Sequence, residues 1–587
     1  MRDVMAMLSE LVTLTTLEEE SPQSFKVRAY ENARLGLESD GRDVTVMTVN
    51  EMTKIKGVGK ATASKIRELV DTGQVPKLIT LREKFPASYV ELSRIPGLGP
   101  KTLKTVRQQL GVVDVEGLKA AIAAEQLRTL PGLGKTSEEK IAKAIERLGM
   151  SGKDRRTPIA DALPLANRLV ADLQALDSVV DVKFCGSLRR FSETIGDIDI
   201  TVASEDPAAV MASVVAHPEA VDLVVNGATK TSFLTSSGLQ VDVRVVAPEQ
   251  FGAAVLYFTG SKAHNIALRR RAINQNMLLN EYGLLNLPDP ELDPDGERTV
   301  VASATEGEIY AALGLSTVPP PMREGTGEVE RAIDGSGEGF GELITRADIR
   351  GDLHYHTARS GDGRSTVEEM VAVAAESGYE YLAITDHGVD LAINGSTAEE
   401  MMEHREHIAH VQEAYPDLHL MWGCELNIDG SGGLDYDQDF RATFDYTVAS
   451  VHSHFDQDPL AQTKRLIAAI SDPTVDSIGH LSGRYIGRRP GIEFEVDAVL
   501  EALMHFDVAL EINGALQRLD ASSDVVRKAV DRGVKLVINT DSHHTSEMGR
   551  MEYGVLTAQR GWAPKDLVIN TWERPRFLEW VNSHRML

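Results

Sequence analysis

The sequence predicts a multidomain α/β protein with a helical N-terminal region, a central α/β region and a C-terminal barrel of mostly parallel strands. Three observations support this division. Residues 1–150 repeat a glycine-turn phrase before helical patterns, and residues 158–316 alternate strand and helix signals. Residues 342–587 repeat short strands that end in histidine, aspartate or glutamate and are separated by helices. This rhythm is typical of a barrel whose functional side chains follow the strands.

The N-terminal region contains three copies of a Gly-hydrophobic-Gly phrase. They read Ile55-Lys-Gly57-Val-Gly59, Ile95-Pro-Gly97-Leu-Gly99 and Leu130-Pro-Gly132-Leu-Gly134. Glycine tolerates the positive φ of a tight turn, and the amides after it would point outward at a helix N-terminus, where a phosphate can bind. This helix-hairpin-helix pattern binds the DNA backbone without reading its sequence. One copy could be an ordinary glycine turn, but three copies with lysines close by favour phosphate binding.

The net charge of −27 argues, at face value, against a nucleic-acid partner. The charge is uneven, however: +3 over residues 1–150, −11 over 151–340 and −19 over 341–587. Phosphate contact needs a local cationic or amide-lined surface rather than a basic chain. The overall acidity still lowers the expected non-specific affinity for DNA.

Hydropathy and cysteine content indicate the cellular compartment of the protein. No stretch approaches the length of a membrane span, and the first residues lack the apolar core of a signal peptide. Only two cysteines, Cys185 and Cys424, are present. We therefore expect no membrane partner, no disulfide framework and a reducing, cytoplasmic location. Nothing in the sequence demands more than a monomer.

The central region places carboxylates on two predicted strands. Asp197 and Asp199, in Gly-Asp-Ile-Asp-Ile, face one side of a strand, and Asp242, in Val-Asp-Val, belongs to a second strand. Three such carboxylates repel one another unless cations lie between them, and two Mg²⁺ ions would neutralise them and support phosphoryl transfer. Upstream, Gly186 and Ser187 offer an amide and a hydroxyl for a triphosphate. Asp-x-Asp alone is weak evidence, but with these neighbours it predicts a nucleotidyltransferase.

A mixed aromatic and basic segment follows, from Leu256 to Arg271. Tyr257 and Phe258 precede a glycine turn and could form a wall beside a sugar. Asn265 and Arg269 are four residues apart and share one helix face. Taken alone, the segment is better explained as an apolar strand end before an ordinary basic helix.

The C-terminal region holds 14 of the 16 histidines, all after Gly341. Many fall in six short blocks rich in metal-ligand types: 352–356, 384–387, 423–425, 451–454, 478–480 and 539–543. Imidazole and carboxylate are ligands of Mn, Zn and Fe, and a His-x-His pair on a strand points both rings to one side. A lone histidine is usually a solvated or satisfied core residue. Six blocks together predict a multinuclear metal site.

These motifs carry a family resemblance. The succession Gly-Ser-x-Arg-Arg, Gly-Asp-Ile-Asp, Val-Asp-Val and Tyr-Phe-Thr-Gly-Ser resembles a family X DNA polymerase with a polymerase β-like core, and the histidine-rich part resembles the polymerase and histidinol phosphatase (PHP) domain. Both in this order resemble a bacterial family X DNA polymerase. The domains then expected are a lyase-like DNA-binding domain (1–80), a helix-hairpin-helix domain (81–155), a nucleotidyltransferase palm (156–250), a nascent-base-pair subdomain (251–316), a Pro/Gly-rich linker (317–341) and a PHP domain (342–587).

The resemblance implies roles for the polymerase residues. Asp197 and Asp199 match the carboxylates shared by two catalytic Mg²⁺ or Mn²⁺ ions, and Asp242 matches the general base toward a primer 3′-hydroxyl. Tyr257 and Phe258 match the segment that excludes a ribose 2′-hydroxyl. The remaining nucleotide-contacting positions are Gly186, Ser187, Arg190, Gly196, Gly260, Lys262, Asn265 and Arg269.

It implies roles for the two ends of the chain as well. The ligands of a site of three Mn²⁺ or Zn²⁺ ions would be His354, His356, Asp362, His387, Glu425, His452, His480, Asp541 and His543, with Asp386 and His454 nearby. In the N-terminal domain, Lys65 falls at the Schiff-base position of a lyase, and Lys26 and Tyr30 fall where a 5′-phosphate is bound. Ala61 departs from the pattern, which has a second lysine there, and a solvated helix lysine is the alternative reading of Lys65.

Three functions remain open at this point. The first is a polymerase that fills gaps in gapped or nicked duplex DNA with dNTPs, and whose PHP domain is a 3′-5′ exonuclease, with abasic-site cleavage and 3′-phosphate removal as further candidate reactions. The second is a small-molecule phosphatase on a DNA-binding arm, which would not need the Asp197, Asp199 and Asp242 set. The third is a polymerase with a purely structural PHP domain, which missing ligands would favour, and none is missing.

Overall fold

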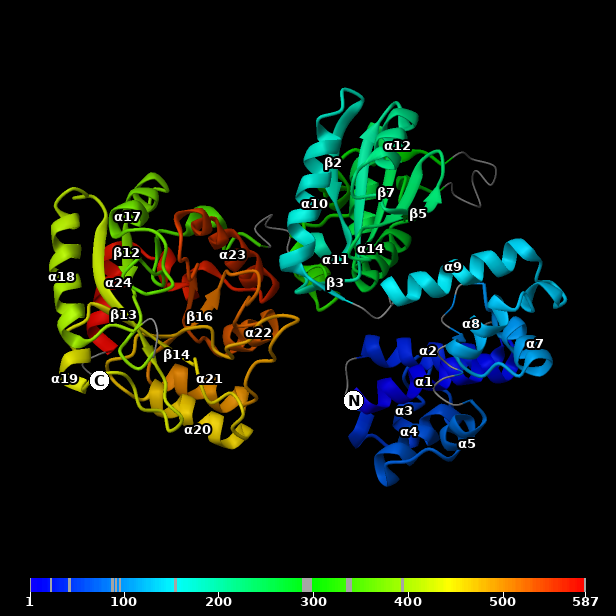
Figure 1. The fold of residues 1–587 in the computed structure, drawn as a ribbon, viewed down its shortest axis with the longest axis horizontal. Helices are drawn as coiled ribbons and strands as arrows, with labels where there is room; N and C mark the ends of the chain where they lie inside the picture. The colour runs from blue at the N-terminus through cyan, green and yellow to red at the C-terminus, as the bar shows by residue number, and fades with distance from the viewer. Residues whose placement is uncertain are drawn as a thin grey trace. The chain divides into compact units, whose positions relative to one another are not determined.

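The computed structural model describes residues 2–21, 24–40, 44–85, 89, 92–93, 95, 97–151, 156–287, 298–333, 340–391 and 395–584. The chain divides into two compact units, Met1–Lys153 and Asp154–Leu587 (Figure 1). Pro96 of the second glycine phrase and residues 334–339 of the predicted linker lie outside the described residues. Among the residues described, no helix has the length and apolar character needed to cross a membrane.

The first unit is helical throughout its described part, as predicted. Its helices are α1 (Arg2–Glu19), α2 (Phe25–Asp40), α3 (Val49–Met52), α4 (Lys60–Thr72), α5 (Pro76–Lys84), α7 (Pro100–Leu110), α8 (Val115–Ala123) and α9 (Lys135–Ser151). They share one apolar core, which includes the fully buried Leu8, Leu11 and Ile66. Because this core is built from apolar faces at helical spacing, it leaves the loops between helices at the surface.

The three glycine phrases form matching turns. Their first glycines, Gly57, Gly97 and Gly132, have φ values of 92°, 93° and 82°. In every copy the N–H of the apolar residue between the glycines donates to the carbonyl three positions earlier, at 3.0–3.1 Å. A Cβ at Gly57 would lie 2.4 Å from the carbonyl oxygen of Asn32, so no side chain fits there. Helices α4, α7 and α9 begin directly after the second glycines, which confirms the predicted helix-hairpin-helix turns.

The second unit begins with a five-stranded mixed sheet, the palm sheet. Its strand order is β2 (Val179–Phe184), β4 (Asp197–Ser204), β7 (Gln240–Val246), β6 (Lys230–Leu234) and β5 (Asp222–Asn226). Strands β4 and β7 are parallel, and the other neighbours are antiparallel. Ile198, Val241 and their alternating neighbours are buried in a core with helices α10 (Ile159–Gln174) and α12 (Pro207–Ala216). The intervening aspartates therefore lie on the opposite face of the sheet.

A second, smaller core follows in the chain. It contains α13 (Phe251–Thr259), α14 (Lys262–Asn274), the antiparallel strands β8 (Met277–Asn280), β9 (Gly283–Asn286) and β10 (Val300–Ala302), and α15 (Glu306–Ala312). Val318, Met322 and Val329, from the stretch whose composition suggested a linker, are also buried in it. Because these apolar side chains are buried, the described part of the predicted linker up to Ala332 belongs to this core, despite its Pro- and Gly-rich composition. The boundaries of the domains stay a prediction.

The rest of the second unit is a nearly closed parallel barrel, as predicted. Seven strands follow in chain order: β11 (Gly351–Asp352), β12 (Tyr381–Ile384), β13 (His419–Asn427), β14 (Tyr446–Ser450), β15 (Ser477–Ile478), β16 (Ala509–Asn513) and β17 (Leu536–Asn539). The N–H of Asp541 donates to the carbonyl of His354 at 2.9 Å, and that of His356 to Ser542 at 2.8 Å. These bonds join the chain after β17 to the chain after β11.

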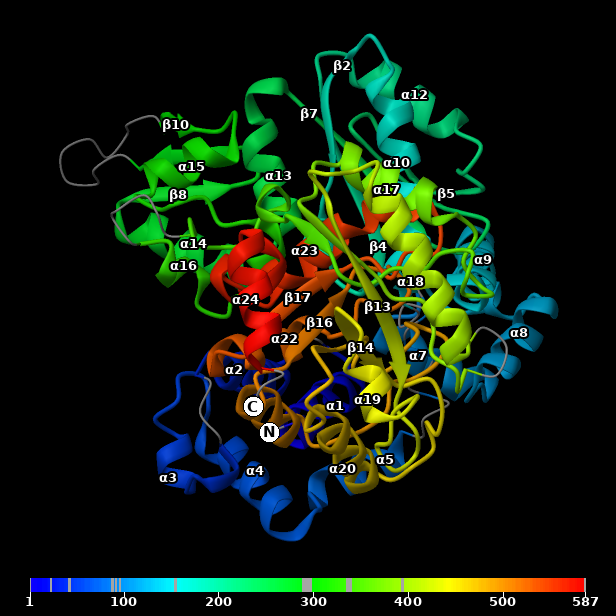
Figure 2. The same cartoon turned by 90° about the vertical axis from the view of Figure 1, so that its left-hand side faces the viewer.

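Helices surround the barrel and close one of its ends. The connecting helices are α17 (Val367–Glu376), α18 (Ala398–Gln412), α19 (Gln438–Arg441), α20 (Pro459–Ile470), α21 (Val496–His505), α22 (Ser523–Arg532) and α23 (Met551–Arg560). The last helix, α24 (Arg574–His584, red in Figure 2), packs Phe577 and Trp580 against residues near the strand starts, such as Tyr381. The rings of Tyr381 and Phe577 stack 4.6 Å apart. The end where the strands finish is thus left to polar side chains.

Candidate metal centres

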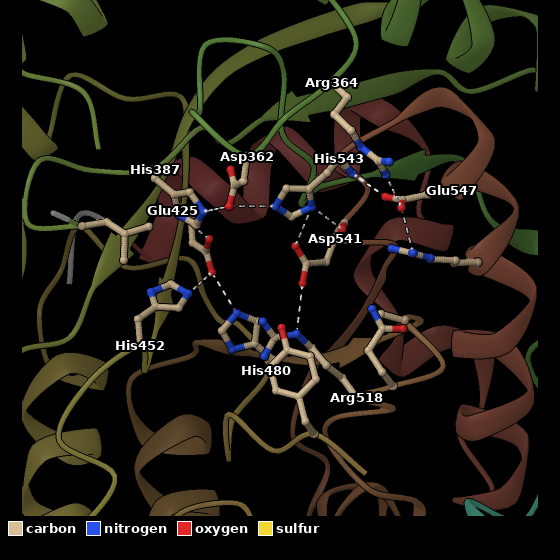
Figure 3. A pocket seen from close by; sticks show the side chains of 15 residues that line it. Asp362, Arg364, His387, Glu425, His452, His480, Arg518, Asp541, His543 and Glu547 are labelled. Atoms are coloured by element: carbon tan, nitrogen blue, oxygen red, sulfur yellow. Dashed lines mark hydrogen bonds and ion pairs between the residues drawn. The ribbon is translucent and has the colours of Figure 1, made fainter. Parts of the chain in front are cut away.

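Polar side chains from all parts of the barrel meet where its strands finish. They line a pocket of about 390 Å³ (Figure 3). The nine predicted ligands come from the strand ends and the loops after them: His354, His356, Asp362, His387, Glu425, His452, His480, Asp541 and His543. The structure brings all nine together, because parallel strands that follow one another around a barrel end at the same rim.

The carboxylate of Glu425 is the centre of this cluster. It is 1% exposed and contacts five imidazoles. The nitrogen–oxygen distances are 3.4 Å for His354 and His356, 2.9 Å for His387, 3.3 Å for His452 and 3.0 Å for His480. Strand β13 places Glu425 inside the barrel, where its two oxygens can serve different neighbours.

Two aspartates complete the cluster on the other side of the pocket. Asp541 Oδ1 lies 3.4 Å from His356 Nε2 and 3.7 Å from His543 Nδ1. Asp362 Oδ2 lies 3.4 Å from His387 Nε2 and 3.5 Å from His543 Nε2. Figure 3 shows Asp362 between His387 and His543. The cluster is therefore a ring of alternating imidazoles and carboxylates.

The donor set fits bound metal ions. Three groups place one ligand atom per residue within 4.8 Å of one another: His356, His387 and His543; His354, His356 and Asp541; and His387, Glu425 and His452. Atoms that share one tetrahedral ion at about 2.0–2.1 Å lie about 3.3 Å apart, close to the contacts seen here. Within the described residues, Glu425 Oε1 and His387 Nδ1 are buried and form no well-aligned hydrogen bond, although His480 Nε2 and Glu425 Oε2 lie 3.0 and 2.9 Å from them. Such atoms need a partner, and a metal ion suits both.

The charges of the cluster are tightly coupled. Burial alone would raise the pKa of the Glu425 carboxyl, but the charges of His452, His354 and His387 hold it well below its usual range. Burial, together with His543 and His387, lowers the pKa of His356 to about 4. Glu425 is thus an anion and His356 a neutral imidazole near neutral pH, the forms that bind metals.

A layer of outer partners orients the rings. His354 Nδ1 lies 2.6 Å from Glu511 Oε2, and His452 Nδ1 lies 2.7 Å from Asn427 Oδ1. Glu511 also accepts the side-chain N–H of Asn539 at 2.9 Å and is fully buried. Sequence reasoning missed Glu511. The signal was available, because a glutamate stands in the middle of a largely apolar strand, Ala-Leu-Glu-Ile-Asn.

The two residues expected near the ligands differ in their surroundings. Asp386 accepts hydrogen bonds from the backbone and hydroxyl of Thr357 at 2.7 and 2.8 Å and lies 2.8 Å from His404 Nε2, so it fixes the loop after His356. His454 has a positive φ of 55°, and its carbonyl accepts a hydrogen bond from Gln462 at 2.6 Å.

The palm sheet carries the second candidate centre. The parallel register of β4 and β7 places Asp199 opposite Asp242 and Asp197 opposite Gln240. Lys230 Nζ lies 2.7 Å from Asp242 Oδ2, and Gln240 donates to Asp242 Oδ1 at 2.8 Å. Sequence reasoning missed Lys230, whose partner lies on the neighbouring strand. The three carboxylates thus share one face of the sheet with a cation already beside one of them.

Gly186 lets the chain approach this centre closely. Its φ is 61°, and a Cβ there would lie 2.5 Å from Asp199 Oδ2. The N–H of Cys185 donates to the carbonyl of Asp199 at 2.7 Å, so the turn is fixed to β4. Ser187 follows in the short helix α11 (Gly186–Arg189), so a helical turn stands where the sequence suggested a loop.

Like charges and burial perturb the palm carboxylates. Burial, with the negative charges of Asp197 and Asp242, raises the pKa of Asp199 to about 7. Burial and Asp242 also raise the pKa of Asp197. Burial would raise the pKa of Asp242 as well, but its hydrogen bonds from Lys230 and Gln240 lower it overall. Added cations would therefore mainly reduce the charge repulsion at Asp197 and Asp199.

The predicted nucleotide-contacting residues line the segment after the palm sheet. Asn265 donates to the carbonyl of Tyr257 at 2.7 Å, and the guanidinium of Arg269 lies 5.1 Å from the centre of the Tyr257 ring. The rings of Tyr257 and Phe258 meet edge to face at 4.9 Å. The structure thus brings these four residues together at the end of α13.

Arg190 is engaged elsewhere. Its guanidinium donates to Glu324 at 3.0 Å and to the carbonyl of Thr259 at 2.6 Å, and Glu324 also binds Arg560 at 2.9 Å. Gly196 precedes β4, Gly260 has a φ of 70°, and Lys262 is exposed at the start of α14.

The candidate lyase residues lie in the first unit. Lys65 Nζ is 5.9 Å from the centre of the Tyr30 ring and donates to the carbonyl of Ala61 at 3.3 Å. Lys26 pairs with Glu19 at 2.6 Å. Lys65 therefore lies over the ring of Tyr30, which is itself 8% exposed and part of the helical core, while Lys26 already has a carboxylate partner.

Glu511→Gln should weaken metal binding at the barrel. The substitution keeps the size of the side chain but removes the charge that orients His354. Loss of such an outer partner typically costs about 10- to 100-fold in metal affinity, measurable by competition with a chelator and by elemental analysis. The exposed Glu501 on α21 offers the matched control, Glu501→Gln. Unchanged affinity in Glu511→Gln would contradict the role given to Glu511.

The raised pKa of Asp199 predicts a pH-dependent stability of the metal-free chain. Its pKa of about 7 exceeds the usual value of 3.8, so the fold favours the protonated carboxyl. The stability that this bound proton adds is fully present below the usual pKa of 3.8 and is lost as the pH rises through about 7. Asp199→Asn should stabilise the palm at about pH 8 by on the order of 1–4 kcal/mol and much less at about pH 4. Scanning calorimetry with a chelator tests this, and an equal effect at both pH values would refute it.

Comparison with known proteins agrees with this geometry. Five protein-family models match: helix-hairpin-helix domain (2–75), SAM-like helix-hairpin-helix tandem (89–147), DNA polymerase beta palm (156–270), DNA polymerase beta thumb (254–324) and PHP domain (352–515). A probable phosphatase of Acetivibrio thermocellus is 29% identical over 228 residues, 38% of this chain and 90% of its own. A probable phosphatase of Shewanella sediminis is 29% identical over 231 residues, 37% of this chain and 88% of its own.

A further relative covers nearly the whole chain. The Bacillus subtilis (strain 168) protein named DNA polymerase/3′-5′ exonuclease PolX is 36% identical over 573 residues, 97% of each chain. The aligned stretch includes the helical, palm and barrel parts, and the family models occur in the order that the motifs predicted. The chain therefore belongs to the family X DNA polymerases that carry a C-terminal PHP domain.

Proposed function

We propose that the chain is a DNA-directed DNA polymerase that fills short gaps during repair and carries a separate, metal-dependent 3′-5′ exonuclease in its barrel. The observation that carries the proposal is the presence of two distinct metal-ligand clusters, one on the palm sheet and one at the barrel rim. The name of the Bacillus subtilis relative supports the same pair of activities. A chain with one activity would need one such cluster.

In the polymerase, Asp197 and Asp199 would hold two Mg²⁺ or Mn²⁺ ions and Asp242 would accept the proton of a primer 3′-hydroxyl. The raised pKa of Asp199 and the lowered pKa of Asp242 support different roles for the two. Gly186 and Ser187 would present an amide and a hydroxyl to the triphosphate. When bound, divalent ions at either centre neutralise the carboxylates and polarise phosphate oxygens.

The remaining nucleotide contacts follow from position. Tyr257 and Phe258 would stand beside the sugar of the incoming dNTP, and Asn265 and Arg269 would contact the nascent base pair. Arg190, Gly196, Gly260 and Lys262 are proposed at the triphosphate, for which Arg190 would have to leave Glu324.

In the exonuclease, the nine ligands of the barrel would hold three Mn²⁺ or Zn²⁺ ions. The buried carboxylate of Glu425, whose two oxygens lie 2.9–3.4 Å from five imidazoles, supports this. The pocket lies at the end of the barrel where the strands finish. The outer partners Glu511 and Asn427 orient the rings of His354 and His452. A purely structural role is not supported, because none of the nine positions is lost.

Removal of a 3′-phosphate is the second candidate reaction of the barrel. The barrel resembles proteins named probable phosphatases, and the chain covers 90% of one of them. A small-molecule phosphatase on a DNA-binding arm would leave the palm aspartates without a purpose. Abasic-site cleavage would use the same pocket.

The partners follow from the same arrangement. The three glycine turns would bind the phosphates of gapped or nicked duplex DNA through helix N-termini. Lys65 beside Tyr30 supports a lyase role at a 5′ end. We propose that the enzyme acts as a monomer in the cytoplasm, in keeping with two buried cysteines that form no disulfide.

Variants of the two clusters should separate the activities. Asp197→Ala or Asp199→Ala should abolish dNMP addition to gapped DNA, because each removes a ligand of both ions, and should leave exonuclease activity intact. His356→Ala or Asp541→Ala should reduce exonuclease activity by about 10- to 100-fold or more, lower the metal content and spare gap filling. Extension and digestion of labelled oligonucleotides measure both.

Circular dichroism of each variant serves as the folding control. Loss of both activities in a folded variant would argue for a single shared site. Near wild-type extension by Asp197→Ala or Asp199→Ala would refute the palm assignment.

Shortening the aromatic wall should relax sugar selection. Tyr257→Ala and Phe258→Ala should raise the use of ribonucleotides relative to deoxyribonucleotides, because a 2′-hydroxyl would no longer be crowded. Single-nucleotide insertion kinetics with matched dNTP and NTP pairs give the ratio. If neither variant changes it, the wall lies elsewhere.

A further inference from the structure

One wall of the barrel pocket carries Arg518, which is not one of the nine predicted metal ligands. Arg518 points at Asp541 (Figure 3), with its Nε 3.5 Å from Asp541 Oδ2. Its guanidinium carbon lies 4.5 Å from the centre of the Tyr485 ring, and both residues line the pocket. Arg518 Nη1 is buried and forms no hydrogen bond with any described residue. A fixed cation with an unused donor therefore borders the metal cluster.

This arginine differs from the other two arginines of the pocket. Arg364 and Arg550 each bind Glu547 at 2.9 Å, so their charges are already paired. Among the described residues, Arg518 forms an ion pair only with Asp541, whose other oxygen faces imidazoles of the cluster. A buried guanidinium donor without a partner is unfavourable. A ligand that brings an anionic oxygen would satisfy it, and the planar fork of arginine suits phosphate.

The wall that holds Arg518 is fastened to the palm. Arg484 forms a two-pronged ion pair with Glu193 of the palm, at 2.7 and 3.0 Å. Arg484 also donates to the carbonyls of Arg518, at 2.8 Å, and Leu519. One side chain thus joins the palm to the backbone of the pocket wall.

Apolar packing reinforces this connection. Leu519 is 1% exposed and belongs to the same core as the palm sheet, with Ile486 and Leu516 packed against it. The N–H of Ile486 donates to the carbonyl of Gln517 at 2.8 Å, which ties the two segments of the wall together. The position of Arg518 therefore depends on contacts made by the palm.

We propose that Arg518, stacked on Tyr485, binds the scissile phosphate of a DNA strand at the barrel centre, and that the palm holds this subsite in place through Glu193. The proposal rests on the exonuclease function proposed above and names its phosphate-binding residue. Arg518 Nη1 meets a non-bridging oxygen while Nε stays on Asp541, and Tyr485 fixes the plane of the guanidinium. Glu193 is a positioning residue, since it acts through Arg484.

Arg518→Lys tests the subsite, because lysine keeps the charge beside Asp541 and loses the fork. Calorimetric titration of the metal-loaded, full-length protein with inorganic phosphate should show affinity lower by about tenfold or more. KM for a single-stranded oligonucleotide should rise, with metal content unchanged. Arg488→Lys, at an exposed position of the same wall, should behave as wild type.

Two outcomes would overturn the assignment of Arg518. Unchanged phosphate affinity would show that the arginine does not bind this group. Loss of metal together with phosphate affinity would show that it serves Asp541 instead. If the wild-type protein lacks exonuclease activity, the proposed function fails, and the phosphate titration still decides on the subsite.

Glu193→Gln tests the contribution of the palm. Breaking the ion pair with Arg484 should weaken phosphate binding and raise the exonuclease KM several-fold, with kcat less affected and gap filling unchanged. Glu205→Gln, at an exposed palm position, is the matched control. Wild-type phosphate affinity and KM in Glu193→Gln would show that the position of Arg518 does not depend on the ion pair with the palm.

Discussion

The charge balance around Glu425 is the constraint on which the C-terminal barrel depends. One buried carboxylate contacts five imidazoles, and two further aspartates share the same rings. Charged groups taken out of water require partners at short distance. The barrel supplies them because its parallel strands finish at one rim, where residues as distant in sequence as His354 and Asp541 meet. Closure of the other end by α24 leaves this rim as the polar end.

The palm balances its charges in another way. Lys230 and Gln240 already neutralise and hydrogen-bond Asp242, and proton binding can relieve Asp199, whose pKa lies near 7. The barrel has no comparable lysine against Glu425 among the described residues; its counter-charges are imidazoles. The two centres therefore differ in how strongly their charge balance depends on bound cations, although both use carboxylates on parallel strands.

Much of this arrangement could be predicted from local sequence patterns. Glycine phrases fixed three turns, alternation on a strand placed Asp197 and Asp199 on one face, and histidine blocks at strand ends identified the barrel ligands. What the patterns could not predict are pairings between distant segments. Glu511, Lys230 and Arg518 each gain their importance from a partner on another strand or loop. The burial of Met322 likewise depends on a core that the Pro- and Gly-rich composition does not reveal.

The central claim is that the ring around Glu425 is a metal centre. Anomalous diffraction from crystals of the purified protein, collected at the absorption edges of Mn and Zn, tests it most directly. The account predicts separate anomalous peaks in the barrel pocket, each about 2.0–2.2 Å from at least two of the nine ligand atoms, with Glu425 touching more than one ion. A pocket without anomalous density, in crystals of active exonuclease, would contradict it.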